Sequence, residues 1–345
     1  MEHVAIDLGG RESQICVRNG EGGIVREDRI STMKLREVLD RPRSRIVLET
    51  CSEAFAVADL ALEYGHDVRV VPASLVKSLG VGARRIKTDR RDARVLSEVS
   101  CRIELPSVHV PSQWSRDAKT LCGMRDALVS CRTKVVNSVR GYLRRVLKRS
   151  PATTGSLSTL PRKVRQRFME AGVVVPSYLE RQLTTVEHLN AAIKEATQEV
   201  TTWAESNPVC VRLMTAPGVG AVTSLRFVAA IDQVERFSDA HQLEAYLGLT
   251  PGEDSSSERR RNTSITKAGP CGVRWTLVQA SWTALRVRPQ DPMCEWALEV
   301  SRRRGIRIGV VALARKLAGV LFAMWRDGTN YRPRRVQLLE ALAHR

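Results

Sequence analysis

The sequence predicts an α/β domain at the N-terminus, followed by a helical arm and a mainly α-helical C-terminal domain. Short apolar runs separated by turns and helical stretches fill the first hundred residues, which is typical of a mixed sheet covered by helices. Two later stretches carry apolar residues every three or four positions, the spacing of long helices. We expect domains at residues 1–110, 111–206 and 207–345.

The composition indicates a polyanionic partner. The 345 residues include 55 Lys and Arg against 37 Asp and Glu, which gives a formal charge of +18. Such an excess favours nucleic acid as the ligand class, and arginine clusters recur in every third of the chain. A merely basic soluble protein is the plainer alternative.

Cysteine usage and hydropathy favour a cytoplasmic protein. Eight cysteines are scattered without a C-x-x-C pair, which argues against a zinc ribbon or a disulfide framework. The N-terminus opens on a strand-like run, so we expect no signal peptide. The apolar segment Val310–Trp325 is interrupted by Arg315 and Lys316, so we expect neither a membrane span nor a membrane partner.

A hairpin is expected at the start of the N-terminal domain. His3–Asp7 reads as a buried strand, and Gln14–Arg18 alternates before a turn at Asn19–Gly23. Ile24 begins the return strand, and a short helix is expected near Met33–Leu39.

A strand–helix–strand unit follows the hairpin. Arg45–Glu49 and Asp67–Val71 are apolar runs of strand length, and Ala54–Tyr64 between them has helical spacing. Gly65 suits the end of that helix. Together with the hairpin, this pattern predicts a mixed sheet.

Four acidic residues are candidate metal ligands. Asp7 and Glu49 end neighbouring strands, and open α/β sheets gather functional groups beyond the carboxyl ends of their strands. Asp89 and Asp92 share a face of an expected helix that would pack across those ends. Carboxylates from three elements suit Mg²⁺, or Mn²⁺ in its place. Alternatively, these acids cap a turn or pair with nearby arginines.

Basic residues around the helix acids would attract a phosphate backbone. They are Arg84, Arg85, Lys87, Arg90 and Arg91.

These acidic motifs resemble a known signature. Asp7 in A-I-D-L-G, Glu49 in V-L-E-T and the stretch K-T-D-R-R-D-A look like the DEDD signature of a family of bacterial insertion-sequence transposases, with Piv-type DNA invertases as relatives. The resemblance implies a RuvC-like N-terminal domain, similar to Holliday-junction resolvases of the ribonuclease-H fold. It assigns the metal-binding, catalytic quartet to Asp7, Glu49, Asp89 and Asp92.

The middle of the chain predicts two long helices. Ser112 is a candidate N-cap for the first, and the second is expected to start near Ser177. A helical hairpin and an intermolecular coiled coil fit this pattern equally well. The expected apolar stripes are Leu121, Met124, Leu128, Cys131, Val135, Val139, Tyr142 and Val146 in the first helix, and Leu179, Leu183, Val186, Leu189, Ile193, Ala196, Val200 and Trp203 in the second.

One feature of the arm and one of the C-terminal domain are candidate nucleic-acid contacts. Arg144, Arg145 and Lys148 lie near the end of the first arm helix. The turn containing Gly218 and Gly220 resembles a helix-hairpin-helix element, in which backbone N–H groups approach a phosphate. A simple turn between helices is the alternative.

A serine run in the C-terminal domain is the candidate nucleophile. Ser255, Ser256 and Ser257 stand beside Arg259, Arg260 and Arg261, with Lys267 beyond. A serine hydroxyl needs a base or a metal to lose its proton, and no histidine is marked as a triad partner, so a Ser-His-Asp hydrolase is poorly supported. Guanidinium groups instead suit charge on a phosphorus centre, although a flexible polar loop is the plainer interpretation.

This segment carries the second half of the resemblance. G-L-T-P, the serines and I-T-K-A-G are similar to the C-terminal motif of the same transposases, where the serine just before a glycine is the proposed nucleophile. Ser257 stands where that glycine is expected. By register Ser256 is the first candidate, Ser255 the second and Ser257 the third.

The last helices are expected at Val273–Val287, Met293–Arg304 and Ile308–Trp325. We interpret Trp275, Trp282, Trp296 and Trp325 as core anchors rather than base-stacking platforms.

The sequence therefore predicts a DNA recombinase that combines a metal-binding acidic quartet with a serine nucleophile. The resemblance also implies a structured guide RNA encoded by the element and a homo-oligomer, dimeric or tetrameric. Two alternatives remain open: a metal-dependent resolvase that activates water, and a non-catalytic scaffold that binds nucleic acid.

Overall fold

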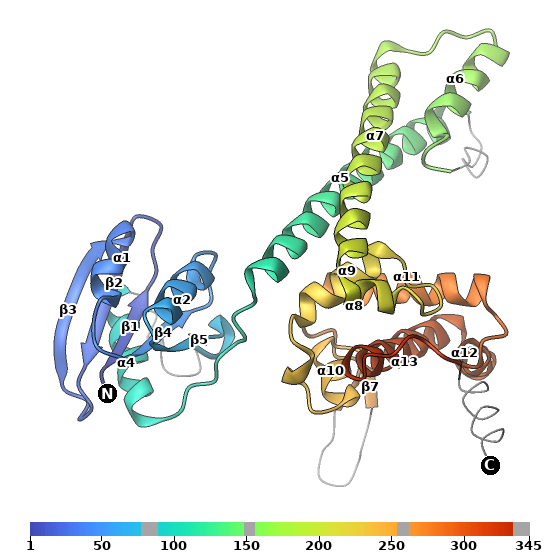
Figure 1. Ribbon diagram of the computed structural model, residues 1–345. Coiled ribbons are helices and arrows are strands. Elements are labelled where there is room, and N and C mark those ends of the chain that lie inside the picture. Colours follow the sequence, from blue (N-terminus) through green and yellow to red (C-terminus); the bar gives the residue numbers. More distant parts are fainter. Residues whose placement is uncertain (77–88, 148–155, 254–261, 334–345) are drawn as a thin grey trace, which may run out of the picture. The chain divides into compact units, whose positions relative to one another are not determined.

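A computed structural model describes residues 1–76, 89–147, 156–253 and 262–333 (Figure 1). The chain divides into two compact units, Met1–Pro111 and Ser112–Arg345. The second unit holds both the arm helices and the C-terminal helices. A further boundary between residues 206 and 207 stays a prediction.

The first unit is built on a five-stranded mixed sheet in the order β3-β2-β1-β4-β5 (Figure 1). β1 lies at its centre, antiparallel to β2 and parallel to β4, and β5 continues the parallel half. The strands are β1 (His3–Asp7), β2 (Glu12–Arg18), β3 (Ile24–Ser31), β4 (Arg45–Glu49) and β5 (Asp67–Val71).

Helices cover both faces of this sheet. Ile6 and Leu48 share one apolar core with Ala58 of α2, whereas Ala5 and Val47 share a second core with Leu96 of α4. Alternate strand residues point to opposite faces, so both faces are buried. The helices are η1 (Thr32–Lys34, a 3₁₀ turn), α1 (Leu35–Leu39), α2 (Ala54–Glu63), α3 (Ala73–Val76) and α4 (Asp89–Arg102).

The predicted fold class is confirmed, and the elements of the first unit lie where the apolar runs indicated. Gly65 has a φ of 79° just after α2, as a C-terminal cap requires. The short helix expected near Met33–Leu39 is instead a 3₁₀ turn followed by five α-helical residues. The return strand from Ile24 continues as far as Ser31.

In the second unit, α5 (Gln113–Leu147) packs along α7 (Ser177–Ser206), and α6 (Leu160–Glu170) packs on α7 (Figure 1). The backbone N–H of Ser115 donates to Ser112 Oγ at 3.2 Å, which confirms the predicted N-cap. The two long helices therefore form a hairpin within one chain. Arg165 ties α6 to α7 through Glu180 and Glu187.

The buried face of α5 differs from the predicted stripe. Val139 is buried as expected, but Met124 is 66% exposed and Val146 is 47% exposed. The buried apolar positions are Ala118, Cys122, Val136, Val139 and Leu143. On α7 the prediction was better, because Leu179, Leu183, Val186, Ile193 and Val200 are all buried.

The C-terminal part of this unit is a helical bundle around α13. Its core also includes Ala118 and Cys122 of α5 and Val200 and Ala204 of α7, so the base of the arm packs into the bundle. The elements are α8 (Pro208–Leu213), α9 (Ala221–Ile231), η3 (Val234–Arg236), α10 (Ala240–Tyr246), β6 (Pro251–Glu253), β7 (Asn262–Ile265), α11 (Cys271–Val287), α12 (Pro292–Arg304) and α13 (Ile306–Arg326).

By length and composition alone, α13 could cross a membrane. In the fold it is the central helix of the bundle, and its residues Leu313, Leu317 and Leu321 are fully buried. The two charges that interrupt it have partners inside the bundle: Arg315 pairs with Glu244, and Lys316 lies over the ring of Trp296. We therefore interpret α13 as a core helix.

Candidate active site

Two of the predicted acids lie side by side at one edge of the sheet. Ile6 of β1 faces Leu48 of the parallel strand β4, so the next residues, Asp7 and Glu49, are neighbours at the carboxyl ends of these strands. Ala5 contributes to the core on the α4 face of the sheet. Because residues two apart on a strand share a face, Asp7 also points to the α4 side.

The path of α4 brings Asp92 toward the same edge. Ser100 of α4 is hydrogen-bonded to His3 at the start of β1, at 2.8 Å. From Ser100 to Asp92 the helix rises about 12 Å. From His3 to Asp7 the strand rises about 13 Å. Asp92 thus reaches the level of Asp7.

Asp92 is 2% exposed, which is rare for an aspartate and distinguishes it from the arginines around it. Asp89 is the first residue of α4, one turn beyond Asp92, and its side chain lies outside the described residues. The predicted acids therefore come from β1, β4 and α4, as their positions in the sequence indicated.

The donor set at this edge fits a hard cation. Asp7, Glu49 and Asp92 offer carboxylate oxygens, the ligands that Mg²⁺ prefers. Among the side chains that the structure describes, no group of three or more His, Cys, Asp or Glu is already gathered closely enough to hold a metal ion.

An ion-pair clamp holds the first turn of α4 to the sheet. Glu27 of β3 accepts hydrogen bonds from Arg90 at 2.7 Å and from Arg94 at 2.6 Å. The bonds from Arg94 and then Arg90 lower the pKa of Glu27 to about 2. Arg90, predicted as a phosphate contact, is therefore engaged with Glu27, although its side chain is still 63% exposed. Arg91 is exposed as well.

Several predicted residues lie outside the described residues. These are Arg84, Arg85, Lys87, Lys148, Ser255, Ser256, Ser257, Arg259, Arg260 and Arg261.

The segment that carries the serine run is anchored by a two-stranded hairpin. β6 pairs antiparallel with β7, and Glu253 faces Asn262 at the last described residues on either side of the segment. Below the hairpin, the Thr266 N–H donates to the Thr250 carbonyl at 2.9 Å, and the Lys267 N–H donates to Gly248 at 3.1 Å.

Two glycines allow close backbone packing at the base of this hairpin, and one arginine holds it through hydrogen bonds. Gly248 and Gly269 have φ values of 67° and 73°, and a Cβ at either position would collide with backbone of the other arm. Arg274 Nη1 donates to the carbonyls of Leu247 and Ala268, both at 2.9 Å. Lys267, with φ at 58°, is held exposed at the exit of the hairpin.

The glycine turn of the predicted helix-hairpin-helix element connects α8 to α9. Gly218 has a φ of 75°, and a Cβ there would collide with the Ala280 carbonyl of α11, so packing requires this glycine. Gly220 is exposed, precedes the first turn of α9 and has open space around its Cα. Of the two, Gly220 is the N-cap of a helix, the position that the predicted phosphate contact requires.

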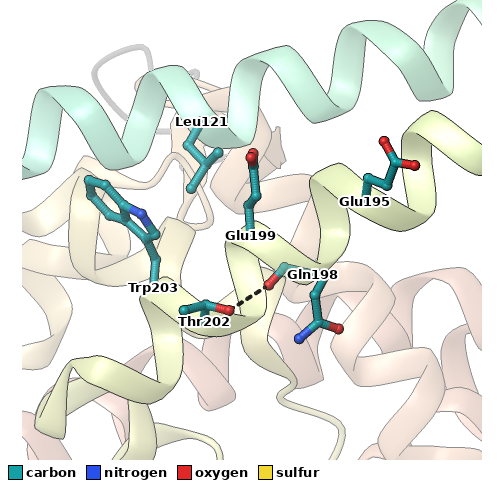
Figure 2. A pocket seen from close by; sticks show the side chains of 6 residues that line it. All are labelled: Leu121, Glu195, Gln198, Glu199, Thr202 and Trp203. Atoms are coloured by element: carbon teal, nitrogen blue, oxygen red, sulfur yellow. Dashed lines mark hydrogen bonds between the residues drawn. The ribbon is translucent and has the colours of Figure 1, made fainter.

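The arm carries both a basic and an acidic surface. Arg144 and Arg145 are exposed near the far end of α5, as predicted for nucleic-acid contacts. Near the base of the arm, a hollow of about 510 Å³ is lined by Glu195, Glu199 and Trp203 of α7 (Figure 2). Glu199 points from α7 toward α5 in Figure 2. Its two carboxylates make this hollow unsuitable for a phosphate.

The interpretation of the tryptophans as core anchors was wrong in three cases. Trp275 is 53% exposed, Trp282 is 43% exposed and Trp296 is 37% exposed, whereas Trp325 packs against the core. Trp275 borders a hollow of about 540 Å³ next to Lys267. The spacing of Trp275, Val278 and Trp282 places them on one face of α11, a signal that the sequence did contain.

Comparisons with known proteins point to transposases. A sequence model described as "Transposase IS116/IS110/IS902 family" matches residues 210–293, and a transposase model for the DEDD domain of IS110 elements matches residues 4–148. The chain is 31% identical over 293 residues to the putative transposase y4qE of Sinorhizobium fredii, covering 81% of this chain and 71% of that one.

Two further relatives are similar over almost their whole lengths. The transposase for insertion sequence element IS1111A of Coxiella burnetii is 25% identical over 333 residues, with 95% of this chain and 91% of that one covered. The transposase for IS1328 of Yersinia enterocolitica is 25% identical over 341 residues, with 95% and 98% covered.

Proposed function

This chain belongs to the IS116/IS110/IS902 family of transposases, and we propose that it cuts and rejoins DNA with Ser256 as the nucleophile and a carboxylate-bound divalent ion as its assistant. Family membership makes the chain a DNA-acting enzyme of transposition. The serine, the metal and the guide RNA are the parts that we propose.

The serine step conserves the energy of the phosphodiester bond. As Ser256 Oγ loses its proton and attacks phosphorus, the bond from phosphorus to the leaving DNA oxygen breaks. A phosphoserine link and a free DNA hydroxyl result. A hydroxyl of the partner strand then attacks the same phosphorus and releases the serine. Ser255 is the second candidate, and Arg259, Arg260, Arg261 and Lys267 would neutralise phosphate charge.

Asp7, Glu49, Asp89 and Asp92 are the residues that would hold Mg²⁺ or Mn²⁺. A divalent ion bound there supplies positive charge that polarises the scissile phosphate and favours loss of the serine proton. In the assembled complex, these carboxylates and the serine would act on one phosphate. The proposal does not depend on whether one protomer or two supply them.

The observation that carries the metal half of the proposal is the burial of Asp92. A buried carboxylate is costly and gathers at functional sites. Asp92 is 2% exposed and lies at the level of Asp7. Asp7 is in turn the neighbour of Glu49 at the carboxyl ends of the parallel strands. Three hard oxygen donors at one strand edge support a cation site.

We propose a structured RNA as the guide that selects the DNA, and a dimer or tetramer as the working assembly in the cytoplasm. The family resemblance supports both. Arg144, Arg145 and Lys148 of the arm suit an RNA backbone as well as a DNA backbone.

One experiment tests the serine against its two rivals. The protein is incubated with Mg²⁺ and DNA carrying the ends of the element, then denatured and examined for protein–DNA adducts. We expect adducts with the wild type and with Ser257→Ala, and none with Ser256→Ala. Cleavage without adducts, unaffected by Ser256→Ala, would indicate the water-activating resolvase. DNA binding without any cleavage by the wild type would indicate the scaffold.

A further inference from the structure

A hollow of about 540 Å³ lies beside the hairpin β6–β7, which flanks the serine run. It lies where β7 and the first turns of α11 approach α5 and α9. Its lining is largely apolar. Trp275 and Val278 of α11 and Ile265 of β7 form the apolar part, and Lys267, Arg226 and Arg274 form the basic part.

Trp275 gives this hollow an aromatic wall. It is 53% exposed, although an indole is among the largest apolar groups that folding can bury. Val278 and Ile265, which line the same hollow, are half-buried and pack on the bundle core. The exposed indole thus stands on a packed surface, where a planar ligand has an aromatic group to stack on.

The charge around the hollow is positive. Asp126 pairs with Arg226 at 2.6 Å, so these two charges cancel. Lys267 and Arg274 remain as two net positive charges. The guanidinium of Arg274 is held in place by two backbone carbonyls, and Lys267 is exposed. The hollow thus suits an anion attached to an aromatic ring.

We propose that this hollow binds one unpaired nucleotide, whose base stacks on Trp275 and whose phosphate lies against Lys267. An indole flanked by cations is the arrangement that proteins use to hold single-stranded nucleic acid. The hollow between α5 and α7 provides a contrast, because there Trp203 is accompanied by Glu195 and Glu199.

The position of the hollow gives the stacked base a role in strand exchange. Ile265 ends β7, whose first residue, Asn262, follows the serine segment directly. Three residues of strand span about 10 Å, the length of one or two nucleotides of backbone. A base held on Trp275 would keep a DNA strand unpaired close to Asn262, where the described chain resumes after the serine run. This role rests on the proposed function, whereas the binding itself does not.

The test uses the full chain and short single-stranded oligonucleotides that carry 2-aminopurine, one series of DNA and one of RNA. Stacking on an indole quenches the fluorescence of this base. We expect quenching by the wild type and a Kd about 5- to 150-fold higher for Trp275→Ala, the loss expected for one stacked base. Trp275→Phe should retain most of the affinity. Trp282→Ala, a control two turns along the same helix, should match the wild type.

Trp275→Leu keeps an apolar side chain at this position without a stacking face, and it guards against misfolding of the alanine variant. Quenching and affinity equal to the wild type in Trp275→Leu would overturn the proposal, as would an equal loss in Trp282→Ala. Preference for the DNA or the RNA series identifies the source of the nucleotide. Ser256→Ala should bind as the wild type does. If the wild type itself forms no adducts with DNA, the proposed serine chemistry fails while the stacking result stands.

Discussion

At the scale of single residues, burial separates the acid that we assign to the metal site from ordinary surface acids. Asp92 and Glu98 lie on the same helix, six positions apart. Asp92 is 2% exposed, while the side chain of Glu98 is 40% exposed and pairs with Arg102. In the sequence both are acids with an arginine within four positions, and only Asp92 reaches the edge where β1 and β4 end.

Asp92→Asn should abolish strand cleavage and leave DNA binding largely intact, because it removes a ligand charge and keeps the shape of the side chain. The measurement is the rate of cleavage over a range of Mg²⁺ concentrations, with binding followed separately. Glu98→Gln is the matched control and should cleave at the wild-type rate. Full cleavage by Asp92→Asn at low Mg²⁺ would refute the metal site.

Gly218 and Gly220 offer a second comparison at this scale. Gly218→Ala places a Cβ against the Ala280 carbonyl and forces a φ of 75° on alanine, which alone costs about 1–2 kcal/mol. Gly220 has a φ of −107° and open space. We therefore expect Gly218→Ala to lower the free energy of unfolding by at least about 2 kcal/mol. Gly220→Ala should cost less, about 1 kcal/mol, because alanine is a poorer N-cap of α9 than glycine. Chemical denaturation of both variants decides this, and equal stabilities would contradict the packing role.

At the scale of elements, the clamp between β3 and α4 fixes the helix that carries Asp89 and Asp92. Glu27 is reached by two arginines one turn apart, so it opposes sliding and rotation of the first turn of α4. The hairpin β6–β7 is held in a similar way by Arg274 and by paired glycines. The helix that carries Asp89 and Asp92 and the hairpin that flanks the serine run are thus each fixed by hydrogen bonds to neighbouring elements.

Glu27→Gln should loosen the attachment of α4 to the sheet and so raise the Mg²⁺ concentration needed for half-maximal cleavage. It should also lower the free energy of unfolding by about 1–3 kcal/mol, the value of a hydrogen bond to a charged group.

The effect on stability should depend on pH. Because the pKa of Glu27 is about 2 in the folded protein and 4.5 otherwise, its contribution is complete above about pH 4.5 and is lost as the pH falls toward 2. Urea denaturation at pH 7 and pH 3 should therefore show a smaller effect at pH 3. Asp28→Asn removes an exposed carboxylate of the same strand that pairs with Arg26, so it is the control and should behave like the wild type at both pH values. An Mg²⁺ requirement unchanged by Glu27→Gln would exclude a positioning role.

At the scale of the whole molecule, the sequence was informative wherever a pattern is local. Apolar runs that end in turns located the strands of the first unit, and the carboxyl ends of β1 and β4 indicated where Asp7 and Glu49 would lie. On α7 a single buried stripe gave the correct face. On α5 the same reasoning partly failed, because a 35-residue helix that is apolar on more than one side does not reveal which side packs.

The sequence by itself determined the family, the charge and the order of the elements, because motifs, composition and periodicity are properties of neighbouring residues. Only the tertiary structure decided that Asp92 is the buried acid and that Arg90 pairs with Glu27. It also decided that Gly218 packs against α11 and that Trp275 is exposed. Each of these depends on contacts between segments that are far apart in the chain. Burial and pairing arise from such contacts, and no local pattern specifies them.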